Sequence, residues 1–379
     1  MRPVDPWIAA AAQEIAGRAE RELEALVGVS SPSGDVAGAE EVLAIVAALL
    51  PATAAVRRLP CSSPGHAPDM VADLDGTGTG RLLLLGHVDT VVAHDAHRPM
   101  ERSGERLTGS GTVDMKGGDV LALGVLRALA AAPQRFARVS LLLVCDEEWR
   151  TAPFAHTETF AGYDCCLCFE AGQTDEQGND EVVVRRKAAG TMVVEGHGRS
   201  AHSGSQPDRG ANALLALAEA ARVVAAQHDP AGPEHLTAVP TVLTSGDAFN
   251  VVPAAGRLTS DLRADSERAF DAVLAAIPGR VGEARLEASM LRVWPGMDAR
   301  EAAAPVLAAA ARALGRPVLA GARGGASDAS HLARAIPVTI DGLGPRGGDA
   351  HHPDEYVLAG SLRPRAEVAL ATALAALGR

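Results

Sequence analysis

Two patterns of apolar residues alternate along the first half of the chain, and together they predict alternating helices and strands. Apolar residues recur at helical spacing up to about Val27, from about Gly38 to Leu50 and from about Gly117 to Ala131. Short runs that are apolar throughout, such as LLLLG and VSLLLVC, are typical of strands in a sheet that helices cover on both faces. Such strands are expected at Met70–Leu74, Arg81–Gly86, Val139–Cys145 and Tyr163–Phe169. The first half therefore predicts an α/β layer.

The pattern changes at Arg185–Gly190, where a second kind of segment begins. Its order of strand, helix, strand, strand, helix and strand resembles a split-βαβ (ferredoxin-like) sandwich, which is complete by Pro295. A helix at Ala302–Leu314, an apolar run at Ile336–Ile340 and a final helix at Leu362–Leu377 then restore the α/β pattern. We therefore predict an α/β catalytic domain in two parts, residues 1–188 and 298–379, with a smaller domain inserted at residues 189–297.

Length and charge limit the kinds of partner. A chain of 379 residues with 47% hydrophobic content agrees with two domains. The net charge of -12 argues against nucleic acid or an anionic membrane as a partner, because phosphate binding needs a basic face. Charged residues interrupt the N-terminal apolar residues at helical spacing, which indicates an amphipathic helix and neither a signal peptide nor a membrane span. We expect a cytoplasmic protein that acts on a small molecule.

Five cysteines do not form a disulfide framework, since their number is odd and three of them share one apolar run, Tyr163 to Glu170. Packed thiols in a buried strand are the favoured interpretation, and metal or redox chemistry is the alternative.

The strongest chemical signal is a histidine at the end of a strand. In LLLLGHVDTVV the strand ends at Gly86, and His87 and Asp89 follow on the same side, since strand side chains alternate. Ligands of open α/β sheets bind at the carboxyl ends of strands. His87 is therefore a natural metal ligand and Asp89 a group that orients it. A simple surface pair is the alternative.

Acidic residues stand at similar places elsewhere in the chain. Asp114 lies in the glycine-rich GSGTVDMKGG just before a helix, where its carboxylate could bridge two cations or simply cap the helix. Three adjacent acids, Asp146, Glu147 and Glu148, end one buried strand and would repel one another without a cation, and Glu170 ends another strand. Two late histidines, His351 and His352, complete a set of donors suited to a pair of divalent cations.

With these motifs in place, the chain resembles the family of glutamate carboxypeptidases, acetylornithine and succinyl-diaminopimelate deacylases, and aminoacylases. The resemblance runs from LEALVGVSSPSGD to HHPDEYV. It implies two divalent cations, zinc first with cobalt or manganese as alternatives, and a cis peptide bond after Asp114. It also implies that Asp89 orients a ligand and that Glu147 is the general base. The metal ligands that it implies are His87 and Glu170 for the first metal, Asp114 as the bridge, and Glu148 and His351 for the second. His351 stands four residues before Glu355, as the family's late histidine does, and His352 is the alternative.

The same resemblance assigns roles in the inserted domain, which in this family forms a homodimer. It aligns His202, within GHGRSAHSGSQPDRGANAL, with a histidine that reaches the partner's active site, where we expect it to stabilise the oxyanion. It aligns Asn250 and Arg263 with substrate contacts, and Arg263 with the substrate carboxylate. Gly325 and Ser327, within GGASDAS, belong to a glycine-rich loop of the same pocket. His202 could instead cap backbone, and Arg263 could pair with Asp261 or Asp265.

One feature departs from the family's pattern. A glycine-rich turn usually follows the acidic pair in this family, whereas Trp149 and Arg150 follow it here, and these side chains are expected to narrow or charge the pocket. The leading functional hypothesis is a two-metal hydrolase that cuts an amide bond of N-acyl or peptidyl amino acids with a free carboxylate, in the manner of glutamate carboxypeptidases. An N-acetyl or N-succinyl deacylase is the close alternative. An aminopeptidase and an inactive dimeric binding protein of the same fold are the less favoured ones.

Overall fold

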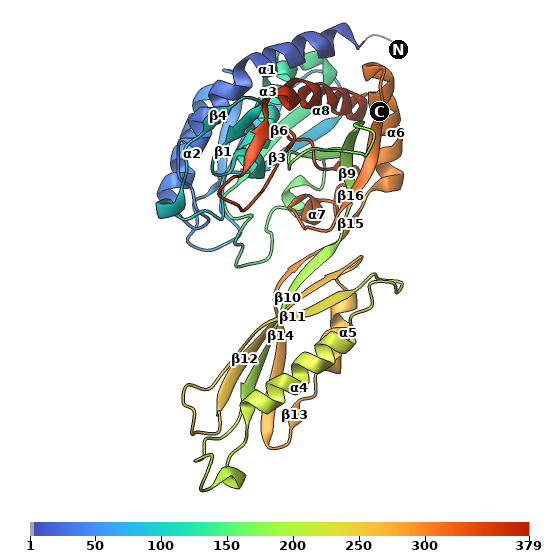
Figure 1. Ribbon diagram of the computed structural model, residues 1–379. Coiled ribbons are helices and arrows are strands. Elements are labelled where there is room, and N and C mark those ends of the chain that lie inside the picture. The colour runs from blue at the N-terminus through green and yellow to red at the C-terminus, as the bar shows by residue number, and fades with distance from the viewer. Residues whose placement is uncertain (1–3, 379) are drawn as a thin grey trace. The chain divides into compact units, whose positions relative to one another are not determined.

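A computed structural model gives the fold of the chain and describes residues 4–378 (Figure 1). The chain forms two compact units. The first unit contains the residues up to Arg185, Asp298–Ala322 and the residues from Ser327 onward. The second unit contains Arg186–Met297 and Arg323–Ala326.

A six-stranded sheet forms the centre of the first unit, in the order β1-β2-β6-β3-β7-β17. The neighbours β6, β3, β7 and β17 run parallel to one another, whereas β1 and β2 are antiparallel additions at one edge. The register places His87 beside Val144 and Leu85 beside Cys168, so the carboxyl ends of three strands share one edge. The strands span Ala55–Leu59 (β1), Asp69–Asp75 (β2), Arg81–His87 (β3), Arg138–Val144 (β6), Cys165–Cys168 (β7) and Thr339–Ile340 (β17).

Helices pack around this sheet and bury it. The side chains of Leu82 to Leu85 are at most 1% exposed, as expected for a strand that is covered on both faces. The first helix begins where Asp5 accepts hydrogen bonds from the backbone N–H groups of Trp7 and Ile8, with Pro6 at its first position. The helices of this unit are α1 (Pro6–Val27), α2 (Val36–Leu49), α3 (Gly117–Ala130), α6 (Arg300–Leu314), the short α7 (Ala329–Leu332) and α8 (Leu362–Leu377). The α/β fold class predicted from the sequence is confirmed.

Two smaller sheets complete the first unit. One contains β15, β9 and β16 with β8 beside β9, and the other has the order β18-β19-β5-β4. Their strands are β4 (Glu101–Ser103), β5 (Arg106–Thr108), β8 (Gln173–Thr174), β9 (Asp180–Arg186), β15 (Met297–Asp298), β16 (Val318–Arg323), β18 (Gly347–Gly348) and β19 (Tyr356–Leu358). The second sheet brings the segment that contains His351 next to β5.

The second unit is an antiparallel sheet with two helices on one face (Figure 1). Its order, β11-β12-β10-β14-β13, is that of a ferredoxin-like sandwich with one added strand, β13, at the edge. Leu217 and Phe270 from the helices pack with Met192 and Leu262 from the sheet in a separate apolar core. The elements are β10 (Ala188–His197), α4 (Ala213–Ala226), β11 (Thr237–Ser245), β12 (Ala255–Ala264), α5 (Ala269–Ala276), β13 (Arg280–Val281) and β14 (Ala284–Trp294).

Two further observations concern the whole described chain. Within residues 4–378, no helix combines the length and the apolar character needed to cross a membrane. The cysteines are free thiols, and four of them, Cys145, Cys165, Cys166 and Cys168, are buried. The three that share the predicted strand lie in β7, where they pack in the core of the first unit.

Candidate metal centre

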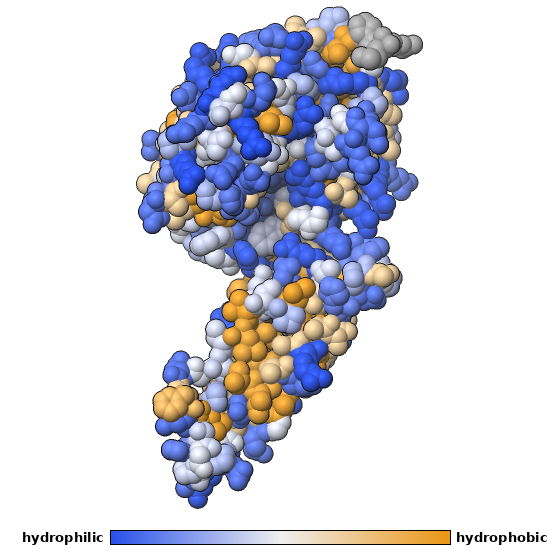
Figure 2. All heavy atoms as spheres, viewed as in Figure 1, coloured by the Kyte–Doolittle hydropathy of each residue, from blue (hydrophilic) through white to orange (hydrophobic). Residues whose placement is uncertain are grey.

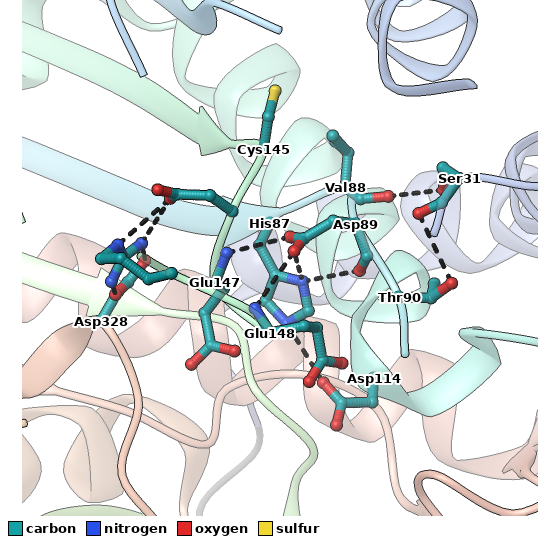
Figure 3. A network of polar contacts seen from close by, with 12 residues as sticks. Ser31, His87, Val88, Asp89, Thr90, Asp114, Cys145, Glu147, Glu148 and Asp328 are labelled. Carbon is teal, nitrogen blue, oxygen red and sulfur yellow. Dashed lines mark hydrogen bonds and ion pairs between the residues drawn. The ribbon is translucent and has the colours of Figure 1, made fainter. Parts of the chain in front are cut away.

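Candidate side chains from four segments meet at the carboxyl edge of the central sheet (Figure 3). His87 ends β3, Glu147 and Glu148 follow β6, and Glu170 follows β7. Asp114 comes from the turn that leads into α3. In Figure 3 the carboxylates of Asp114, Glu147 and Glu148 point to the same side of the strand ends. The candidate residues of the sheet edge are therefore gathered in one place.

The turn that carries Asp114 has an unusual backbone. Gly111 has a φ of 75°, a left-handed conformation that favours glycine, and the peptide bond between Asp114 and Met115 is cis, which confirms the prediction for that bond. A Cβ atom on Gly118 would lie 1.9 Å from the carbonyl oxygen of Phe169. The start of α3 can therefore pack directly against the end of β7, which brings the turn close to Glu170.

Asp114 lies between two histidines, one on each of its carboxylate oxygens. His87 Nε2 is 3.1 Å from Asp114 Oδ1, and His351 Nε2 is 3.1 Å from Asp114 Oδ2. Glu170 Oε1 lies 3.8 Å from the same His87 nitrogen, and Glu148 Oε2 lies 3.2 Å from the same His351 nitrogen. The cluster therefore has two halves that share one carboxylate, which suits a pair of bridged cations.

The donors of this cluster fit metal ions. One ligand atom from each of His87, Asp114 and Glu148 lies within 4.8 Å of the others. Glu148 Oε1 is buried and has no hydrogen-bond partner among the described residues, which costs free energy unless a cation binds there. His351, which is about half exposed, has a φ of 65°, a rare conformation for a residue with a side chain.

Electrostatics of the cluster favour added positive charge. Burial lowers the pKa of His87, but the contacts with Asp114 and Asp89 outweigh burial and raise this pKa well above its usual range. Hydrogen bonds to Asp114 and Glu148 raise the pKa of His351 to about 10. Burial raises the pKa of Asp114, but its two histidines outweigh burial and hold that pKa below its usual value. These directions show that the carboxylates attract cations, whether protons or metal ions.

Asp89 holds three groups of the cluster at once. Its side chain is 1% exposed, and its two oxygens accept the backbone N–H groups of Glu147 and Glu148, each at 3.1 Å. His87 Nδ1 lies 3.0 Å from the carbonyl oxygen of Asp89 and 3.4 Å from its Oδ1. A proton on Nδ1 leaves the lone pair of Nε2 directed at Asp114, which is the tautomer that a metal ligand needs.

Glu147 is the candidate general base. It follows the same strand as Glu148, but only Glu148 contacts His351. Burial raises the pKa of Glu147 well above its usual range, and the nearby carboxylates of Asp328, Glu170 and Glu148 raise it further. A raised pKa brings a carboxylate closer to the range in which it can accept and return a proton near neutral pH.

Comparison with known proteins identifies the family. The model of peptidase family M20/M25/M40 matches residues 83–375. The chain belongs to this family. Carboxypeptidase G2 of Pseudomonas sp. (strain RS-16) is 25% identical over 355 residues, which covers 89% of this chain and 84% of that relative. Succinyl-diaminopimelate desuccinylase of Rhodopseudomonas palustris (strain BisA53) is 30% identical over 338 residues, which covers 76% of this chain and 81% of that relative.

Solved structures share the fold of the family over almost the whole chain. A tripeptidase from Staphylococcus aureus has a TM-score of 0.76 at 21% identity and covers 96% of this chain and 99% of its own. An M20 family metallo-carboxypeptidase from Sulfolobus solfataricus has a TM-score of 0.72 at 15% identity. The match covers 94% of this chain and 98% of the carboxypeptidase chain. Membership of the M20 family confirms the resemblance that the sequence motifs indicated, and with it a hydrolase that depends on two metal ions.

The second unit contains the three predicted residues His202, Asn250 and Arg263. The Nδ1 atom of His202 accepts the backbone N–H groups of Gly204 and Ser205, both at 3.1 Å, so its proton lies on Nε2, where it can be donated. Asn250 is exposed, and its carbonyl oxygen accepts the backbone N–H of Ser203 at 3.0 Å. The first unit supplies the five donors of the cluster, and the second unit supplies these three residues.

Arg263 forms an ion pair within the second unit. Its Nη2 lies 2.9 Å from Asp261 Oδ1, and its Nε donates to both oxygens of the same carboxylate. This is one of the pairings that the sequence left open. Both side chains are partly exposed, at 34% and 41%.

The glycine-rich loop divides between the two units, with Gly325 in the second and Ser327 in the first. Gly325 accepts a hydrogen bond from Arg186 at 2.7 Å through its carbonyl oxygen. The Ser327 hydroxyl is buried and donates to Asp341 Oδ2 at 2.6 Å. That hydrogen bond gives the hydroxyl a structural partner inside the first unit.

Sequence reasoning missed two parts of the cluster's support. Glu355 is 2% exposed and accepts the backbone N–H groups of Gly111, Val113 and Asp114 at 2.7 to 2.9 Å. Burial raises the pKa of Glu355 to about 7, although these N–H groups act to lower it. The second is the burial of Arg150, whose side chain was expected to narrow or charge the pocket. The signal for Glu355 is its place four residues after His351. In the sequence this spacing indicated only which of the two histidines is the ligand, and not that Glu355 itself supports the turn.

Proposed function

We propose that the chain is a two-metal hydrolase that cleaves the amide bond of N-acyl or peptidyl amino acids with a free carboxylate, with a carboxypeptidase activity of the glutamate type. The observation that carries the proposal is the position of Asp114 between His87 and His351, with the half-buried Glu147 nearby. The similarity to carboxypeptidase G2 across 89% of the chain supports the substrate class.

Five residues are proposed as metal ligands, and zinc as the native ion, with cobalt or manganese as alternatives. His87 and Glu170 would hold the first ion, Glu148 and His351 the second, and Asp114 would bridge them. A mixed set of imidazole and carboxylate donors suits divalent ions of this kind. Two such ions, when bound, polarise the scissile carbonyl and lower the pKa of a water molecule.

The remaining steps belong to side chains of the protein. Glu147 accepts the proton of the attacking water and returns it to the leaving amine, a role worth about 10²–10⁴ in rate. Asp89 holds the amides of both glutamates and the ring of His87, so that base and ligand keep their relative positions. His202 donates its Nε2 proton to the developing oxyanion, and Arg263 exchanges its internal partner, Asp261, for the carboxylate of the substrate.

A second candidate is a deacylase that removes a succinyl or acetyl group. The similarity to succinyl-diaminopimelate desuccinylases, at 30% identity over 76% of the chain, favours it specifically. Both reactions use the same metal centre and the same base, so only the groups around the substrate distinguish them. The pair Trp149 and Arg150, at the point where the family usually has a glycine-rich turn, lies next to the ligand Glu148.

Metal removal and a substrate panel test the proposal together. The panel contains a folyl-glutamate, N-acyl glutamates, N-succinyl-diaminopimelate, N-acetylornithine and simple dipeptides. Dialysis against a chelator should abolish turnover, and zinc, cobalt or manganese should restore it. Preference for the first two substrates supports the carboxypeptidase, and preference for the next two supports the deacylase. A preference for dipeptides that is lost when their amine is acylated would indicate an aminopeptidase, and two bound metals without any turnover would indicate a binding protein.

The second unit is proposed to form a homodimer. Nine of the twelve large hydrophobic side chains that are exposed among the described residues belong to this unit. They include Leu215 in α4, Val242 in the edge strand β11, and Phe249. Figure 2 shows the apolar surface of this unit. An exposed edge strand flanked by apolar groups is a usual place for a second copy to bind.

The dimer matters because His202 is proposed to act in the partner's active site. Subunits with His202→Ala are mixed with subunits with Glu147→Gln, each nearly inactive alone. One site of a mixed dimer then combines an intact Glu147 with the intact partner subunit's His202, so activity should return. Differently tagged subunits show whether mixed dimers form. If mixed dimers form and stay as inactive as their parents, His202 does not act in the partner's active site.

A further inference from the structure

Arg150 is a buried cation two residues after the metal ligand Glu148. Its side chain is 3% exposed, and its guanidinium carbon lies 4.9 Å from the centre of the Phe154 ring. A buried guanidinium remains charged, so the fold must supply negative partners for it. Two carboxylates supply them, Asp146 and Asp328, and both are themselves almost completely buried.

The guanidinium binds the two carboxylates at once. Its Nη2 donates to Asp146 Oδ1 at 2.7 Å and to Asp328 Oδ2 at 2.8 Å. Its Nε donates to Asp146 at 3.2 Å, and its Nη1 donates to Asp328 Oδ1. The fork towards Asp328 is bidentate, a geometry that a guanidinium provides and an ammonium group does not. We refer to these three residues as the Arg150 clamp.

The Arg150 clamp joins segments that are far apart in the sequence. Asp146 follows β6, and its other oxygen accepts the backbone N–H of Ser63 at 2.8 Å. Asp328 lies at the start of α7, in the glycine-rich stretch GGASDAS. The clamp therefore ties the strand-end loop of residues 145–150 to two other parts of the first unit.

Glu147 and Glu148 lie between the Arg150 clamp and a second anchor. Their backbone N–H groups are both held by the carboxylate of Asp89 (Figure 3). Arg150 fixes the loop on one side of the glutamates and Asp89 fixes it on the other. Without the guanidinium, Asp146 and Asp328 would be two adjacent negative charges beside Glu147, and their repulsion would displace the loop.

We propose that Arg150 is a positioning residue for the hydrolytic reaction, which it supports by binding Asp146 and Asp328 and thereby fixing the loop that carries Glu147. The inference rests on the proposed function, since it needs Glu147 as the base. Four of the five proposed metal ligands, His87, Asp114, Glu170 and His351, lie outside this loop, so loss of the clamp affects the base more than the metals. A displacement of the base by about 1 Å is enough to lower a rate by about 10²-fold.

Three variants test the inference in the full-length protein. Arg150→Met removes the charge but keeps the length of the side chain, and Arg150→Lys keeps the charge but cannot form the fork. Arg127→Met is the matched control, because Arg127 also forms a bidentate pair with a buried carboxylate, that of Glu22, but between α1 and α3. The measurements are kcat, KM, metal content and the hydrogen exchange of the backbone amides of residues 146–150.

For Arg150→Met we expect a kcat about 10²-fold lower, a KM within about threefold of wild type, and two metals retained. Arg150→Lys should recover part of the lost kcat, and it serves as the test should Arg150→Met fail to fold. The amides of Glu147 and Glu148 should exchange faster in both variants, whereas Arg127→Met should leave kcat and these amides unchanged.

Three outcomes would overturn the inference: a kcat within twofold of wild type for both Arg150 variants, a loss of activity that tracks loss of metal, or a change confined to KM. Failure of the proposed function has a different signature. In that case the wild type itself would hydrolyse none of the amides, and the exchange of the two amides would still decide whether Arg150 fixes the loop.

Discussion

Replacement of Asp89 by asparagine tests how strongly one carboxylate controls the metal centre. The two oxygens of Asp89 accept the backbone N–H groups of Glu147 and Glu148, and its carbonyl and Oδ1 face the Nδ1 atom of His87. Asparagine keeps the shape of the side chain but has a single acceptor oxygen. One glutamate amide must then face an NH2 group, which cannot accept its proton.

The size of the effect follows from the lost hydrogen bond. A hydrogen bond to a charged group contributes about 1.5–3 kcal/mol, and Asp89→Asn removes one of the two that position Glu147 and Glu148. At about 1.4 kcal/mol for each factor of ten, metal affinity should fall about 10–100-fold. Because the Asp89 side chain is 1% exposed, bulk solvent has little access to replace the lost acceptor.

Competition with a chromophoric chelator measures the affinity for metal in the wild type and in Asp89→Asn. Asp73→Asn is the matched control. Asp73 is also a buried aspartate with several partners, Arg57, Arg138 and Ser140, but it lies in β2 away from the ligands. Asp73→Asn should lower the thermal midpoint and leave metal affinity unchanged. If Asp89→Asn binds metal within threefold of wild type, Asp89 does not orient the ligands in the way described.

The other predictions concern four residues of the first unit. Glu147→Gln should abolish turnover while two metals remain bound, and Glu148→Gln should lose metal; elemental analysis with the opposite result would refute these assignments. Glu355→Gln leaves a backbone N–H of the Asp114 turn without an acceptor, so it should destabilise the protein by about 1–3 kcal/mol and weaken metal binding, as denaturant titration and chelator competition would measure. Burial raises the pKa of Asp119 to about 8, and its oxygens have no hydrogen-bond partner among the described residues. The folded state then holds a proton that the unfolded chain has released, so the metal-free protein should lose stability as pH rises from about 4 to 8. Asp119→Asn should flatten this part of the profile, and thermal midpoints across pH that coincide for the two proteins would contradict it.

The parts of the site that the sequence could predict are those where local pattern and position agree. A continuous apolar run marks a buried strand, and the residue that follows it must lie at the edge of the sheet. The sequence indicated His87 and Glu170 in this way because each directly follows such a run, and it indicated Glu148 as the last of three acids that follow one. Asp114 was found because glycines and the start of a helix surround it. In all four cases a few neighbouring residues are enough to indicate the place in the fold.

The parts that the sequence could not predict depend on segments that are distant along the chain or too short to have a pattern. The strands β8 and β18 have two residues each, and no periodicity can be read from two positions. The partners of Arg150 lie 4 and 178 residues away, and nothing next to Asp328 indicates that its carboxylate binds a guanidinium. The sequence indicated that Arg150 would narrow or charge the pocket.

Burial changes what the charge of Arg150 can do. An exposed arginine beside Glu148 would add positive charge to the pocket and would favour anionic substrates directly. In the structure, two carboxylates already surround the guanidinium, so the three residues together carry one negative charge and not a positive one. Recognition of a substrate carboxylate must therefore come from a different cation, and Arg263 is the proposed one. The residue that departs most clearly from the family's pattern thus contributes to the position of the base, while the choice of substrate depends on other residues.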